Sequence, residues 1–149
     1  GALLEFASEE LRDDKEVVLD AVHNNPEALE FASDRLKGDR EVVYDSVSKV
    51  GWTYCYVQEK LLEDKELLMA GLKISGQILY FAAPDMRDDK EAVKEAVTNK
   101  PIIIKYASNR LREDKEIGLA AMNVNKNCYE FLGPNLKKDE EILNIKNCT

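Results

Sequence analysis

Two stretches near the start of the chain decide the fold: LLEFASEELRDDKEVVLDAV at residues 3–22 and ALEFASDRLKGDREVV at residues 28–43. They align without a gap at a shift of 25 residues, and the same shift aligns almost all of the 149 residues. A fixed period of this length is the signature of a repeat architecture. The chain therefore forms one domain, residues 1–149, of six units, which are residues 1–25, 26–50, 51–75, 76–100, 101–125 and 126–149.

An acidic pair marks every unit without exception. The Asp of the pair is Asp14, Asp39, Asp64, Asp89, Asp114 and Asp139, and the Glu is Glu16, Glu41, Glu66, Glu91, Glu116 and Glu141. A base stands between them in five units, at Lys15, Arg40, Lys65, Lys90 and Lys115, and Glu140 replaces it in the last. We interpret the Asp as the N-cap of a helix and the Glu as a favourable charge in its first turn. Divalent cation binding between neighbouring acidic turns is the minor alternative.

The pattern within each unit predicts a pair of short helices. In unit two, Leu29, Ala32 and Leu36 follow one helical spacing, while Val43 and Val47 belong to a second. The first helix begins after a Pro or Gly and spans about eight residues, and a tight turn follows in which serines act as local caps, namely Ser8, Ser33 and Ser108. Helices this short need neighbours to be stable. We therefore predict an all-α fold, an α-solenoid of six 25-residue helix-turn-helix repeats.

Composition excludes several classes of partner. The 29 acidic residues against 21 basic ones give a net charge of -8, which argues against nucleic acid or anionic membrane as the main ligand. The sequence shows no apolar run of the roughly 18 to 20 residues that a membrane helix needs, and no leader. The three cysteines, Cys55, Cys128 and Cys148, form no CxxC pair. We expect a soluble protein of a reducing, cytoplasmic compartment.

Residues suited to catalysis are scarce. The single histidine, His23, lies at a helix end, and no glycine-rich phosphate loop is present. Cys55 has no base beside it in the pattern, so a reactive thiol is not expected. We expect no enzymatic activity, no cofactor and no metal site. An enzyme would require a pocket in which titratable groups converge.

The aromatic residues give the only hint of a binding site. One column, Phe6, Phe31, Tyr56, Phe81, Tyr106 and Phe131, is interpreted as core, together with Tyr54 and Tyr129. Three others, Tyr44, Trp52 and Tyr80, occupy columns that are polar in other units and should face solvent, and Met69 shares the column of Tyr44. We predict that these four residues bind a protein partner. Repacking of unit three around Trp52 and Cys55 is the alternative.

The two stretches quoted at the outset resemble the microbial repeats grouped as domain of unknown function 4116. The resemblance covers all six units and is strongest in units one, two, four and five. It implies a helical repeat module, often part of a longer microbial protein, and brings no activity or catalytic residue with it. The function predicted is a protein-interaction module; a structural spacer and an unrecognised enzyme are the alternatives.

The two ends of the chain differ in character. Gly1 stands in register with Pro26 and Gly51, so we expect the piece to begin at a unit boundary within a longer protein. In unit six, Lys146 and Asn147 replace apolar columns, as in a polar capping unit. The pattern leaves open whether this cap is natural or the result of truncation.

Overall fold

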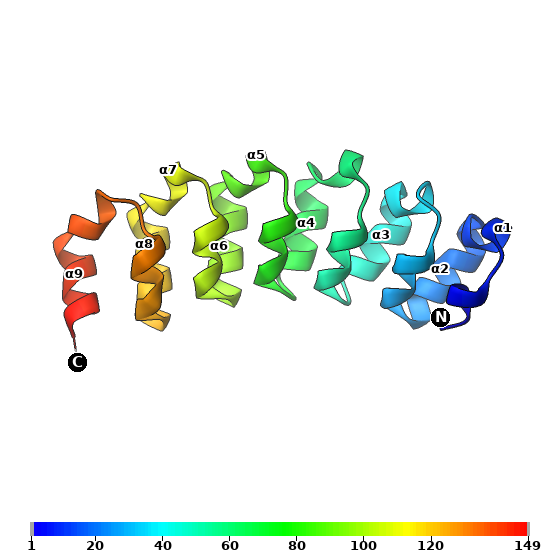
Figure 1. Cartoon of the computed structure of the whole chain (residues 1–149), viewed down its shortest axis with the longest axis horizontal. Helices are drawn as coiled ribbons and strands as arrows, with labels where there is room; N and C mark the ends of the chain where they lie inside the picture. The colour runs from blue at the N-terminus through cyan, green and yellow to red at the C-terminus, as the bar shows by residue number, and fades with distance from the viewer. Residues whose placement is uncertain (1, 149) are drawn as a thin grey trace.

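The computed structural model describes residues 2–148, which form helices and connecting turns without a strand. Each unit contains three helical segments in the same order, and successive units stack side by side into a gently curved rod (Figure 1). One row of helices lies in front in this view, a second row lies behind it, and short segments join the two rows along the top. The predicted all-α repeat fold is confirmed.

The first segment of each unit is a 3-10 helix and not the α-helix that the sequence suggested. These segments are η1 (Ala2–Phe6), η2 (Pro26–Phe31), η4 (Gly51–Tyr56), η6 (Gly76–Phe81), η7 (Pro101–Tyr106) and η8 (Lys126–Phe131). Backbone hydrogen bonds between residues three apart form at both ends of η2. Ala28 N–H donates to Asn25 O at 2.9 Å, and Ala32 N–H donates to Leu29 O at 3.1 Å. Ala32 is extended and ends it. The helix is thus tighter and shorter than the eight residues expected.

The second long segment of each unit is an α-helix that begins directly after the repeated Asp. These helices are α2 (Lys15–Asn24), α3 (Arg40–Val47), α4 (Lys65–Leu72), α6 (Lys90–Asn99), α8 (Lys115–Val124) and α9 (Glu140–Asn147). The Asp is extended, and its carboxylate accepts from backbone amides of the first turn, as in the 3.0 Å bond from Leu67 N–H to Asp64 Oδ1. The same capping bond forms in every unit, which confirms the predicted N-cap.

A short helical segment occupies the place of the predicted tight turn. These segments are α1 (Glu9–Arg12), η3 (Leu36–Gly38), η5 (Glu59–Leu61), α5 (Pro84–Arg87), α7 (Asn109–Arg112) and η9 (Leu136–Lys138). Ser8 and Ser108 are the N-caps of α1 and α7, and each accepts from the amide three residues later at 3.2 to 3.3 Å. Ser33 accepts from Leu36 N–H at 3.3 Å, but the N-cap of η3 is Arg35, whose side chain makes no capping bond. Each unit is therefore a pair of helices joined by one extra helical turn.

A continuous apolar core runs between the two rows. The fourth position of the first five units is buried, at Leu4, Leu29, Tyr54, Leu79 and Ile104. The 3-10 helices supply these residues, and the α-helices supply Val18, Val43, Leu68 and Val93 together with Val22, Val47, Leu72, Val97 and Met122. Helices too short to be stable alone are therefore held by their neighbours.

The aromatic column predicted to lie in the core lies at its rim instead. Phe6 and Phe81 are exposed, and the other four members are only partly buried. The third position of the 3-10 helix, Thr53 or Ile78 for example, fills the interior. The sixth position lies one turn further along on the same side, at the last residue of the helix, and its ring extends past the core to the surface. Of the two remaining rings assigned to the core, Tyr54 is fully buried and Tyr129 is half-buried.

Candidate functional site

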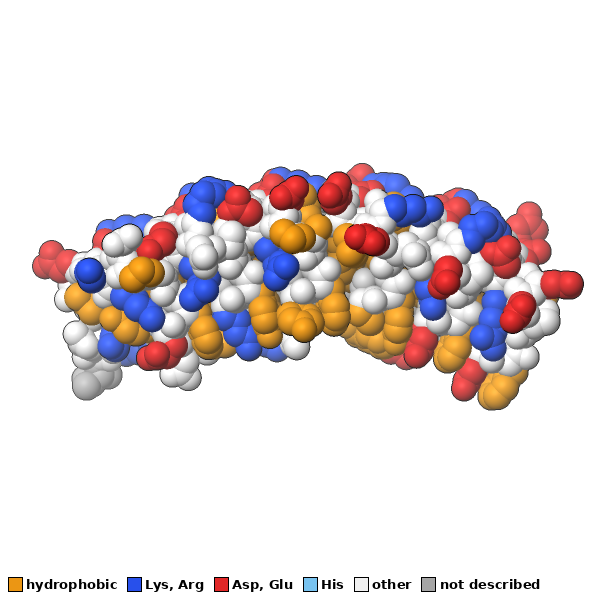
Figure 2. All heavy atoms as spheres, turned by 45° about the horizontal axis from the view of Figure 1, so that its top comes forward, with side chains coloured by type: hydrophobic (Ala, Val, Ile, Leu, Met, Phe, Trp, Pro, Cys, Tyr) orange, Lys and Arg blue, Asp and Glu red, His pale blue; other side chains and the backbone are white. Residues whose placement is uncertain are grey.

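The acidic pairs form an ion-pair ladder that ties each unit to the next. Lys65 of unit three contacts Asp89 of unit four at 3.0 Å and Glu91 at 2.7 Å. The bases of units one, two, four and five make the same double contact with the acidic pair one unit later. In Figure 2, acidic and basic side chains lie interspersed along the upper edge of the rod. The repeated motif therefore joins neighbouring units. Within residues 2–148, no group of three or more His, Cys, Asp or Glu side chains is placed to hold a metal ion.

The ladder lowers the pKa of its aspartates. Burial alone would raise the pKa of Asp64, but the hydrogen bonds from Arg40 and from the Leu67 amide outweigh it, and the pKa lies below 3.8. At Asp39, Asp89 and Asp114, hydrogen bonds from the base of the preceding unit and from a backbone amide likewise outweigh the effect of burial and lower the pKa. At Glu116, hydrogen bonds from Lys94 and Lys90 lower the pKa to about 2. These carboxylates stay ionised in the fold at any pH near neutrality.

We expect acid to weaken the stacking. A carboxylate whose folded pKa lies below its unfolded pKa stabilises the fold above about pH 4, and this stabilisation is lost as the pH falls through the folded pKa. Asp64→Asn keeps a good N-cap but removes the charge that faces Arg40. Its urea midpoint should therefore fall less steeply with pH than that of the wild type between about pH 5 and pH 2. Asp20→Asn, which lies outside the ladder, serves as the control. If the urea midpoint of Asp64→Asn falls with pH as steeply as that of the wild type, the charge of Asp64 does not stabilise the stacking.

Trp52 and Tyr80 lie on the outer face of the 3-10 row, as predicted. Trp52 is 42% exposed and Tyr80 is 54% exposed. They occupy the second and fifth positions of their units, and these positions eclipse each other in a 3-10 helix. The same geometry that buries the first and fourth positions therefore turns both of these residues outward.

A groove lies between η4 and η6 on this face. It has a volume of about 290 Å³, and its lining residues, which define the aromatic groove, are Trp52, Cys55, Ser75, Gln77, Ile78 and Phe81. The Trp52 ring packs edge-on against Tyr56, with centroids 5.7 Å apart. Tyr80 packs edge-on against Phe81 at 5.0 Å and against Tyr106 at 4.9 Å. The rings thus form one row across units three to five.

Charged groups of opposite sign flank this row. Towards unit two, the Glu30 carboxylate adds to the effect of burial in raising the pKa of Tyr56. Towards unit six, the Lys105 ammonium lies 4.9 Å from the Tyr106 ring centroid. Burial, with a smaller contribution from Glu30, also raises the pKa of the Cys55 thiol, so this thiol is poorly activated as a nucleophile.

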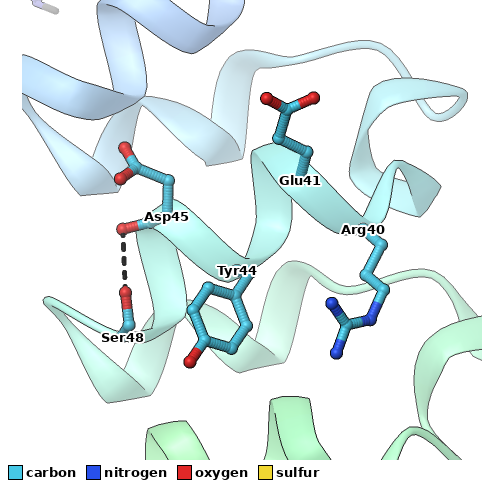
Figure 3. Close-up of a pocket in the computed structure, with 5 residues that line it drawn as sticks. All are labelled: Arg40, Glu41, Tyr44, Asp45 and Ser48. Carbon is cyan, nitrogen blue, oxygen red and sulfur yellow. Dashed lines mark hydrogen bonds between the residues drawn. The ribbon is translucent and has the colours of Figure 1, made fainter.

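Tyr44 and Met69 lie apart from the aromatic groove. Both belong to the α-helical row, on α3 and α4, and Met69 is packed partly against the core. Tyr44 lines a surface hollow of about 520 Å³ with Arg40, Glu41, Asp45 and Ser48 (Figure 3). Figure 3 shows Tyr44 and Arg40 pointing towards α4, and the Arg40 guanidinium lies 5.6 Å from the ring centroid. The structure therefore divides the four predicted residues between two surfaces.

The His23 side chain is exposed and lies in a charged, open hollow. Its Nδ1 is 3.1 Å from Lys49 Nζ and 3.5 Å from an Asp45 carboxylate oxygen. The hollow around it is lined by Leu19, Asp20, Glu41 and Asp45 and contributes no hydroxyl or thiol nucleophile. His23 thus takes part in a surface charge cluster.

Sequence reasoning missed Tyr56, Phe81 and Tyr106 as members of the exposed row. Their column is aromatic in every unit, which suggests a core on an α-helical reading. Their spacing gives no signal of exposure, because their place at the rim depends on the 3-10 helix ending at Tyr56, Phe81 and Tyr106, after which the backbone is extended.

The stacked three-segment units and the ion-pair ladder define an α-solenoid of tandem repeats. Within this class, the chain belongs to the family described as domain of unknown function (DUF4116), which matches residues 1–37, 39–87 and 89–137. The second and third matches each span about two of the 25-residue units. No curated protein and no solved structure matches the chain. In the part that the structure describes, no helix has the length and apolar character to cross a membrane.

Proposed function

We propose that this chain is a non-catalytic helical-repeat module that binds a protein partner through the aromatic groove and the rings beside it. The observation that carries the proposal is the row of surface rings from Trp52 to Tyr106 in units three to five. Aromatic side chains that flank a pocket are the usual centre of a protein interface. The proposal includes no cofactor, metal or small-molecule substrate.

The scaffold favours this use of the surface. The groove is formed by two neighbouring 3-10 helices that are fixed to one buried core, and Trp52 and Phe81 each pack edge-on against a neighbouring ring before a partner arrives. Pre-organised rings lose little conformational entropy on binding. A plain spacer needs no such row, since units one and two carry Glu5, Glu27 and Glu30 on this face.

The charges around the groove suit a partner segment with an apolar anchor. Glu30 on one side would favour a basic group of the partner, and Lys105 on the other would favour an acidic one. The free thiols of Cys55, Cys128 and Cys148 suit the reducing, cytoplasmic setting that we propose for this interaction.

Trp52→Ala and Tyr80→Ala should each weaken partner binding at least about tenfold, as expected for residues at the centre of an interface. Partners would be captured with the wild-type chain, identified by mass spectrometry and then titrated by calorimetry against each variant. Tyr44→Ala is the matched control, because Tyr44 is a similarly exposed ring on the other row. Circular dichroism should show an unchanged helix content in all three. Equal affinity of all three variants would rule out the aromatic groove as the binding site.

A further inference from the structure

The outward-facing positions of the 3-10 helices change character from unit to unit along the rod. These are the second and fifth positions, and they are exposed in units two, three and four. Their residues are Glu27 and Glu30 in unit two, Trp52 and Cys55 in unit three, and Gln77 and Tyr80 in unit four. An exposed Lys105 holds the fifth position of unit five. The aromatic groove therefore has an acidic pair one unit before it and a basic residue one unit after it on the same face.

The step from one unit to the next fits one kind of extended peptide. The 3-10 helices of this region pack in sequence along the rod, η2 on η4, η4 on η6 and η6 on η7 (Figure 1). Packed helices lie about 8–10 Å apart. A polyproline II helix has three residues per turn and advances about 9 Å in one turn, whereas an α-helix advances about 5.4 Å and a strand returns to the same face after about 7 Å. Residues three apart in a polyproline II segment would therefore meet the same position of successive units.

The groove and its rings supply the contacts that such a segment needs. The groove volume of about 290 Å³ lies below the roughly 300–1,000 Å³ of small-molecule pockets, which suits one or two rigid side chains. Trp52 and Phe81 offer aromatic surface on which a proline ring can pack. A polyproline II backbone makes no internal hydrogen bonds, so its carbonyl groups need donors. The indole N–H of Trp52 and the hydroxyl of Tyr80 are such donors on exposed rings.

Two other common modes of peptide recognition lack their structural basis here. Addition of a strand to a sheet edge requires a sheet, and residues 2–148 contain no strand. Recognition of a phosphorylated segment requires clustered arginines, and none of the residues that line the aromatic groove is an arginine. Grooves lined by aromatic side chains are instead typical of sites that recognise proline-rich segments.

The charges on the face set the position of the segment. Glu27 and Glu30 lie one unit before the groove, so they face the residue three positions away from a proline that fills the groove. A Lys or Arg at that place meets opposite charge. The Lys105 ammonium is at the other end of the row, 4.9 Å from the Tyr106 ring centroid, and would repel a basic residue placed there. A single exposed ion pair contributes little affinity, so the charge mainly fixes the register.

We propose that the aromatic groove binds a proline-rich segment of a partner protein in the polyproline II conformation, which lies along the rod across η4, η6 and η7. One proline fills the groove, a second proline three residues on covers the rings of Tyr80 and Tyr106, and a Lys or Arg three residues away on the other side faces Glu27 and Glu30. This inference rests on the proposed function and names the chemistry of its partner.

Synthetic peptides test the proposal on the whole chain. The probe is a run of about nine prolines, roughly three turns, with an arginine at the N-terminal end in one peptide and at the C-terminal end in another. Trp52 is the one tryptophan of the chain, so its fluorescence reports on the groove directly. We expect at least one probe to shift the emission of Trp52 to shorter wavelength. Calorimetry should give an affinity at least about tenfold higher than for an arginine-tagged Gly-Ser peptide of the same length, which must lose more conformational entropy on binding.

Variants of the chain locate the bound peptide. Trp52→Ala should weaken the better probe at least about tenfold, and Glu30→Lys should weaken it about threefold by reversing the charge that faces the arginine. Glu130→Lys is the matched control, because Glu130 is an exposed Glu at the same position of unit six. It should leave the affinity unchanged. Circular dichroism should show the wild-type helix content in each variant.

Failure of both probes to bind the wild type would overturn this inference, as would full affinity in Trp52→Ala. Tighter binding of an arginine-tagged amphipathic helical peptide would also overturn it in favour of a helical partner. Equal weakening by Glu30→Lys and Glu130→Lys would overturn the proposed register. The proposed function fails by a separate result, in which a captured partner binds Trp52→Ala as tightly as the wild type. Loss of partner binding in Trp52→Ala without any binding of the probes would reject the proline-rich segment alone.

Discussion

Replacing Tyr54 with Ala should lower the free energy of unfolding by about 3–5 kcal/mol, the range found for removal of a large buried side chain. Tyr54 is fully buried in the middle of the rod. Its hydroxyl donates to Leu62 O at 3.3 Å, and burial raises the pKa of the phenol. In units one, two, four and five a Leu or Ile fills this position, so the neighbours of Tyr54 are arranged around a larger ring and Ala would leave a cavity.

Tyr54→Phe separates the ring from its hydroxyl. It keeps the packing and removes one hydrogen bond, so we expect a loss of about 1 kcal/mol. Both variants would be compared with the wild type by urea denaturation at neutral pH, with a check that the slope of the transition is unchanged. If the two variants lose the same amount, the ring does not fill the core in the way described.

The stacking of units could be predicted from sequence because it depends on period alone. Asp64 and its equivalents recur every 25 residues, and an Asp before a helical apolar stripe is a local signal for an N-cap. The pairing of Arg40 with Asp64 and Glu66 could not be predicted in the same way. Within a unit the base stands between two acids, and only the spacing of neighbouring helices shows that its partners are one unit later.

The composition of the candidate site was harder to predict for a related reason. Trp52 and Tyr80 stand out because their columns are polar elsewhere, and this argument holds for any kind of helix. Phe81 belongs to an aromatic column, and its exposure depends on its place at the last position of a 3-10 helix, one turn beyond the buried Ile78. Amphipathic spacing does not distinguish six residues of 3-10 helix from a short α-helix. The separation of Tyr44 from Trp52 likewise follows from the two rows, which the repeat period does not specify.

Gly76→Ala should destabilise the rod by about 1–3 kcal/mol, as expected when an atom is forced into a closely packed contact. A Cβ at this position would clash with the carbonyl oxygen of Ala96, which already accepts from Lys100 N–H at 2.8 Å. The Gly76 amide also donates to Asn99 Oδ1 at 2.9 Å, which holds η6 against the end of α6. Because the obstacle is backbone, relief requires η6 and α6 to move apart.

Gly38→Ala is the matched control for this prediction. A Cβ there would meet the Lys60 Cε, the far end of a flexible side chain that can rotate away. Neither glycine has a positive φ, so the two substitutions differ in what surrounds them and not in backbone strain. We expect the urea midpoint of Gly38→Ala to stay close to that of the wild type, within about 0.5 kcal/mol in stability. Similar losses in both variants would show that the close approach of η6 to α6 is not the cause, and that glycine is needed there for another reason.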